Sequence, residues 1–131
     1  MTEAQGRNLD IQCAELGRQL AGIRDDKNRS IEEKVFNEAL TVLEEQGPYA
    51  MFLYLKARHD KVADPVSRES LNFLKEVFED RLESVNDILD AIRRLAEDLD
   101  DLLFARDLLR TALSYARYHL KAKDTSAGRT K

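Results

Sequence analysis

Residues 46–61 read QGPYAMFLYLKARHDK, and this stretch is the centre of the expected fold. Gly47 tolerates the left-handed conformation that closes a helix, and Pro48 fits the first turn of the helix that follows. The run from Tyr49 to Leu55 is apolar on nearly every side, which predicts a central helix surrounded by the others. We therefore expect Phe52 to be buried.

The end of this stretch turns abruptly basic, with Lys56, Arg58 and Lys61. Cations suit the last turn of a helix because the helix dipole is negative there, so these residues have a plain structural interpretation. An apolar helix with a cationic end is also a candidate anion contact. The sequence leaves both interpretations open.

Length and composition bound the class of protein. A chain of 131 residues fits one domain with a sizeable core, and its 5 Gly and 2 Pro favour helices. The net charge of −4 argues against a protein that coats nucleic acid with its whole surface, although one basic face is compatible with it. Cys13 has no disulfide partner and fits a reducing cytoplasm. With no signal peptide and no apolar run long enough for a bilayer, we expect a soluble, cytoplasmic protein without a membrane partner.

Apolar residues at spacings of three and four predict further amphipathic helices before and after the central helix. The expected helices cover 9–24, 31–46, 48–61 and 100–121. Residues 1–8 should be loose, and residues 122–131 should form a disordered basic tail. The fold class is all-α: a compact bundle of five or six helices, in a single domain over 1–121.

Between the central helix and the last helix, the pattern leaves two alternatives. The pair Asp64-Pro65 predicts a turn, after which an unbroken apolar seam from Leu71 to Leu102 favours one long helix. Ser84 with Asp87 resembles a capping signature and would instead mark a break near Glu83.

Three further local signals concern a helix cap, the cysteine and two glycines. Ser30 and Glu33 predict a capping box at the start of the second helix. Cys13 lies on an apolar seam and should be a small core residue. Gly17 and Gly22 either weaken the first helix or let another backbone approach it closely, and the sequence does not decide between these.

Signals of catalysis are weak throughout the chain. The glycines never cluster into a phosphate-binding loop. His59-Asp60 is similar to the metal-binding dipeptide of some phosphohydrolases, but His119 is the only other histidine. A solvated pair is therefore the preferred interpretation. We expect no catalytic residue, no metal, no cofactor and no enzymatic activity.

The distribution of charge is more informative than any motif. Acids dominate residues 76–101, and four cations follow at spacings of four, seven and four: Arg106, Arg110, Arg117 and Lys121. On a helix they share an arc of roughly 60°, and we call them the basic stripe. A basic stripe with tyrosines nearby can follow a phosphate backbone. Alternatively, these cations pair with acids of a neighbouring helix.

With these features, the chain resembles the small all-helical subunit of type III CRISPR effector complexes, of the Cmr type, over about residues 9–123. Gln46-Gly47 corresponds to the Asn-Gly element that ends the family's second helix, with Gln46 in place of the Asn and Pro48 in place of the usual apolar residue after the Gly. An apolar helix that finishes in a basic segment follows, here 52–58. The early Arg, the apolar run and the basic end of the last helix are similar as well; the matching residues are Arg106, Leu109, Leu113, Tyr115, Leu120 and Lys121.

The resemblance implies a non-catalytic building block for antiviral defence. Such subunits stack head to tail beside the backbone subunits, with a basic face along the guide–target duplex. The implied partners are guide RNA, target RNA or a displaced strand, other effector subunits and further copies of itself. The implied RNA-binding residues are Lys56, Arg58, Lys61, Arg106, Arg110, Arg117 and Lys121. The alternative is a helical protein–protein adaptor or antitoxin-like regulator without RNA contact.

Overall fold

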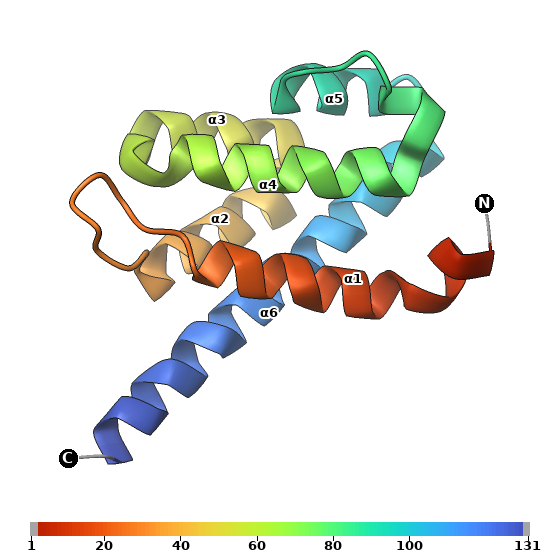
Figure 1. The fold of residues 1–131 in the computed structure, drawn as a ribbon. Helices are drawn as coiled ribbons and strands as arrows, with labels where there is room; N and C mark the ends of the chain where they lie inside the picture. Colours follow the sequence, from red (N-terminus) through yellow and green to blue (C-terminus); the bar gives the residue numbers. More distant parts are fainter. Residues whose placement is uncertain (1–2, 130–131) are drawn as a thin grey trace.

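Helices make up most of the described chain. The computed structural model describes the backbone of residues 3–129 and the side chains of residues 8–123. Within that range it is an all-α bundle of six α-helices and one 3₁₀ helix (Figure 1). They are α1 (Glu3–Ala21), α2 (Glu33–Gln46), α3 (Pro48–Arg58), α4 (Asp60–Phe78), η1 (Glu79–Leu82), α5 (Ile88–Leu95) and α6 (Leu99–Arg129). α6 crosses the bundle diagonally, and its C-terminal turns project beyond the other helices (Figure 1).

The junction between α2 and α3 forms as predicted. Gly47 closes α2 with a φ of 97°, in the region that disfavours residues with a Cβ, and its N–H donates to the carbonyl of Leu43 at 3.0 Å. Pro48 is the first residue of α3, and Phe52 is buried with 2 % exposure. α3 is not surrounded on all sides, however, because Leu53 is 44 % exposed. Its buried residues share one face, so α3 packs as an ordinary amphipathic helix.

The most extensive helix–helix contact joins α1 to α6, and it explains Gly17. A Cβ at Gly17 would lie 2.5 Å from the Cβ of Tyr115 and 2.7 Å from the carbonyl oxygen of Ala112. Gly17 therefore permits close approach of another backbone, whereas a Cβ at Gly22 would meet nothing closer than 3.6 Å. Cys13 is buried in the same contact, as expected of a small core residue.

The predicted turn at Asp64-Pro65 is wrong. α3 ends at Arg58, His59 interrupts the helical backbone, and α4 continues through Pro65. A proline inside a helix costs about 3 kcal/mol or more. Burial of Val62 and Val66 on either side of it, with the apolar residues one and two turns later, offsets that cost.

The single long helix expected over the seam is also wrong. The alternative break near Glu83 is confirmed, but Asp87 and not Ser84 is the N-cap after it. α4 ends where Glu79 adopts a φ of 48°, and the Asp87 carboxylate caps α5 by accepting from the N–H groups of Leu89 and Asp90. Leu82 and Val85 stay buried across this break. The apolar seam continues because the 3₁₀ turn and the loop after it also point their apolar side chains inward.

Three predicted ends differ from the structure. α1 begins at Glu3, where the sequence predicted a loose segment up to residue 8. The Ser30–Glu33 capping box is absent: Glu32 is the N-cap of α2, and the Ser30 hydroxyl accepts from Arg24 at 2.9 Å. α6 continues to Arg129, so the backbone of 122–129 is helical where the sequence predicted a disordered tail. Extending an existing helix is far easier than nucleating one, and Lys and Ala favour it.

Candidate nucleic-acid interface

The first half of the basic stripe faces α2. Arg106 Nη2 lies 3.6 Å from Glu44 Oε2 and donates to the Glu44 carbonyl at 3.4 Å. Arg110 Nε lies 2.6 Å from Glu44 Oε1, at ion-pair distance but without the alignment of a hydrogen bond. Arg110 also pairs with Asp107, one turn before it, at 2.5 Å. One carboxylate of α2 thus holds two cations of the stripe.

The second half of the stripe is more open. Lys121 is exposed, and its Nζ lies 3.5 Å from Glu33 Oε1 at the start of α2. Arg117 is half-buried and makes no hydrogen bond or ion pair with any described side chain; its Nε is shielded from solvent. The interpretation in which the stripe pairs with a neighbouring helix therefore holds for Arg106, Arg110 and Lys121. Their partner helix is α2 rather than the acidic stretch over 76–101.

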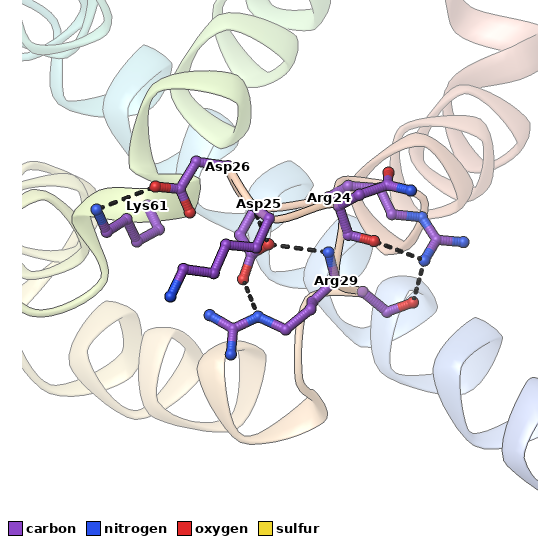
Figure 2. Close-up of polar contacts among 8 residues, drawn as sticks. Arg24, Asp25, Asp26, Arg29 and Lys61 are labelled. Atoms are coloured by element: carbon purple, nitrogen blue, oxygen red, sulfur yellow. Dashed lines mark hydrogen bonds and ion pairs between the residues drawn. The ribbon is translucent and has the colours of Figure 1, made fainter.

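The basic end of α3 lies on the other side of α2. Lys56 and Arg58 are exposed. Lys61, in the first turn of α4, pairs with Asp26 of the loop after α1 at 3.1 Å (Figure 2). The pairing raises the pKa of Lys61, chiefly through its hydrogen bond with Asp26. Figure 2 also shows Arg29 held within the same loop by Asp25, at 2.8 Å.

α2 separates the two groups of cations and supplies carboxylates to both sides. Glu33 and Glu44 face α6, whereas Glu38 faces α3 and accepts from His59 at 2.7 Å and from the Tyr54 hydroxyl at 2.9 Å. The seven residues proposed for RNA contact therefore do not form one continuous basic face. They fall into a group on α3 and α4 and a group on α6.

His59 is not the solvated residue that the sequence suggested. Its side chain is only 18 % exposed, and its ring packs edge-on to Tyr54 with centroids 5.9 Å apart. The hydrogen bonds from His59 and Tyr54 lower the pKa of Glu38 below its ordinary value. This cluster ties α2 to the α3–α4 junction. Among the described side chains, no three His, Cys, Asp or Glu residues are placed to hold a metal ion.

One group of basic side chains has no signature in the sequence. Arg18 of α1 lies beside His119 and Lys123 of α6, around a hollow of about 470 Å³. The spacing of His119 and Lys123 is that of neighbours on one helix face. Their meeting with Arg18 depends on how α1 and α6 cross, which no helical periodicity reveals.

Comparisons with protein-family models, with curated proteins and with solved structures found no match to this chain. Among the described residues, no helix combines the length and the apolar character that crossing a bilayer requires.

Proposed function

We propose that this chain is a non-catalytic small subunit of a type III CRISPR effector complex, stacking along the backbone and contacting the guide–target RNA duplex. The observation that carries the proposal is the arrangement of the elements on which the resemblance rests. Gly47 and Pro48 join α2 to the amphipathic helix α3, whose exposed basic end presents Lys56 and Arg58. The last helix carries the basic stripe and projects from the body (Figure 1).

The polarity of charge along the molecule supports stacking of copies. Exposed acids cluster from η1 to the start of α6; they are Glu79, Asp80, Glu83, Asp87, Asp90, Glu97, Asp98 and Asp100. Lys121 is exposed and belongs to the C-terminal half of α6. That half of α6 projects away from α5 (Figure 1). An acidic end meeting a basic end is a head-to-tail contact, which generates an open row of subunits.

The proposed RNA-binding residues differ in their internal ion pairs. Arg106 and Arg110 are held by Glu44, so their charge is partly neutralised before RNA arrives. Lys56 and Arg58 are exposed and form no ion pair with a described side chain. We therefore expect the end of α3 to contribute more per residue than the first half of the stripe.

Isolation of the tagged chain from its own host tests the proposal. The expected result is co-purification with other effector proteins and with small guide RNAs, identified by mass spectrometry and RNA sequencing. Recovery of the chain without RNA, either alone or with a single protein partner, would contradict it.

Substitution of the stripe tests the RNA contact itself. Replacing Arg106, Arg110 and Arg117 with Ala should leave the fold intact. The partly exposed ion pairs of Arg106 and Arg110 contribute only about 0–1 kcal/mol each, and Arg117 has no ion pair with a described side chain to lose. The triple substitution should lower target-RNA retention by the assembled complex and reduce its dependence on salt. The matched variant Glu44→Gln frees two arginines and should raise retention. Unchanged retention by both variants at low and high salt would show that the stripe is not the RNA face.

A second candidate function is a helical protein–protein adaptor or antitoxin-like regulator. It is favoured by the pairing of the stripe with α2 and by two exposed leucines on the first turns of α6. Leu99 is 66 % exposed and Leu103 is 42 % exposed, one turn apart on the same face. For an adaptor, Leu103→Asp should abolish partner recovery, whereas the stripe variant should leave it unchanged.

A further inference from the structure

A basic groove opens where α1 ends and α6 runs on. α1 stops at Ala21, and Gly22 has no side chain to fill the space beside α6. The resulting hollow has a volume of about 470 Å³. Its lining residues are Arg18, Ala21, Gly22, His119, Ala122 and Lys123. The groove therefore has a small-residue floor between cationic and imidazole side chains.

The charge of this groove is of one sign. None of the described residues that line it is acidic. The hollow between α1 and α4, by contrast, is lined by Glu15, Glu69 and Glu76. The cations of the basic groove are Arg18 and Lys123, and the one described carboxylate paired with them, Glu15, lies outside the lining. Cations that line a concave surface attract anions, because the shape concentrates the field.

Arg18 retains donors for a ligand. Glu15 accepts from its Nε and Nη2, whereas Nη1 makes no hydrogen bond to a described residue. The pair is exposed on both sides, with side chains 61 % and 49 % accessible, so it is weak and readily shared. The pKa of Glu15 is lowered, first by its hydrogen bond with Arg18, and the charge of His119 acts in the same direction.

An exposed aromatic ring stands next to the groove. Tyr118 is 67 % exposed and lies one turn before Ala122 on α6. Its ring packs edge-on to that of Tyr115, with centroids 6.5 Å apart, which supports the ring while leaving a face open. A cationic groove beside an open aromatic face is the arrangement that binds single strands, with phosphates in the groove and a base on the ring.

We propose that this groove binds the phosphodiester backbone of single-stranded RNA, with Arg18 and Lys123 contacting phosphates and Tyr118 stacking a base. The choice of RNA as the strand rests on the proposed function. The location of the groove is independent of the proposed function. His119 lies about 200° around the α6 axis from Arg117, so the groove is on the side of α6 away from the stripe. The molecule would then hold RNA on two faces of α6.

The test is fluorescence anisotropy of a labelled oligouridylate with the whole chain, over a series of salt concentrations. Each phosphate contact to a single strand steepens the log–log dependence of the binding constant on salt by about 0.7. One contact therefore raises the affinity about 8-fold at 50 mM salt relative to 1 M. Arg18→Gln with Lys123→Gln should therefore weaken binding about 60-fold at 50 mM and flatten the slope by about 1.4. Tyr118→Ala should weaken it at least about 5-fold, with the slope unchanged.

The matched control carries Arg106→Gln and Arg110→Gln, which remove the same charge from the stripe. We expect this control to bind the oligouridylate more tightly than the groove variant does. Equal binding by the groove variant and the wild type would overturn it, and so would an acidic peptide that binds as tightly as the oligouridylate. If only the control loses affinity, the RNA function stands and the groove inference fails. If the groove variant loses affinity but the chain never co-purifies with effector proteins, the groove stands and the proposed function fails.

Discussion

Gly17→Ala tests the closest approach in the fold. The added Cβ would lie 2.5 Å from the Tyr115 Cβ, 2.7 Å from the Ala112 carbonyl oxygen and 2.9 Å from the Ala116 nitrogen. Two of these atoms belong to the α6 backbone and cannot rotate away. Restoring a carbon–carbon distance of about 3.8 Å requires α1 to withdraw from α6 by about 1.3 Å.

That withdrawal has a cost that exceeds the gain in helix propensity. A gap of 0.5–1 Å already forfeits about a quarter to a half of each dispersion contact, and it would open around Cys13, Leu16 and Leu20, all buried here. Overpacking typically costs about 1–3 kcal/mol, and the rigid partners argue for the upper end. Replacing a helical Gly by Ala returns about 1 kcal/mol. The expected net loss in the free energy of unfolding is about 2 kcal/mol.

Urea titration followed by far-ultraviolet circular dichroism measures this loss, provided that the slope m is unchanged. Gly22→Ala is the matched control, because its Cβ would meet only Arg18 and Gln19 carbonyl oxygens at 3.6 Å. It should leave stability unchanged or raise it by up to about 1 kcal/mol. A Gly17→Ala protein as stable as the control would refute the close approach of α1 and α6.

Three further outcomes are expected. Phe52→Ala should lower the free energy of unfolding by about 3–5 kcal/mol, since the ring is 2 % exposed; a loss below about 1 kcal/mol would contradict its burial. Burial, and then the charge of Asp10, raise the pKa of Cys13 from 9.0 to about 11, so its stabilising contribution is complete below pH 9 and is lost as pH rises toward 11. A Cys13→Ala protein should lack that alkaline decline, and the wild-type thiol should react with Ellman's reagent only on unfolding. Hydrogen bonds from His59 and then Tyr54 hold the pKa of Glu38 below 4.5, so their contribution is present above that pH and lost as pH falls through the lowered pKa. Glu38→Gln should flatten this acid limb in denaturant titrations at successive pH values.

The sequence predicted the fold where local chemistry and burial agree. Gly47 and Pro48 specify a junction that needs no tertiary information, and the structure forms it. Asp64-Pro65 predicts a turn when only neighbouring residues are considered, yet burial of Val62 and Val66 keeps Pro65 within α4. The apolar seam from Leu71 to Leu102 predicts one helix, yet such a pattern indicates only which residues are buried. It does not record whether the backbone between them is helical.

The candidate site was less predictable, because a helical wheel gives the face of a helix but not its neighbour. The wheel correctly places the stripe on one side of α6. Nothing in the wheel shows that α2 lies across this side, or that Glu44 holds both Arg106 and Arg110. The Arg18 groove was invisible for the same reason, since its two walls are far apart in the sequence.

Once α2 and α6 are known to be neighbours, the pairing of the stripe follows from spacing alone. Glu44 lies opposite Arg110 and Glu33 lies opposite Lys121, which is the register of two antiparallel helices. One turn from the Glu33–Lys121 pair, toward the Glu44–Arg110 pair, this register places Asn37 opposite Arg117. An amide cannot neutralise a guanidinium, and Arg117 is the stripe residue that makes no ion pair with any described side chain. A carboxylate at every facing position of α2 would have neutralised the whole stripe internally. With an amide at position 37, the charge of Arg117 has no carboxylate opposite it on α2.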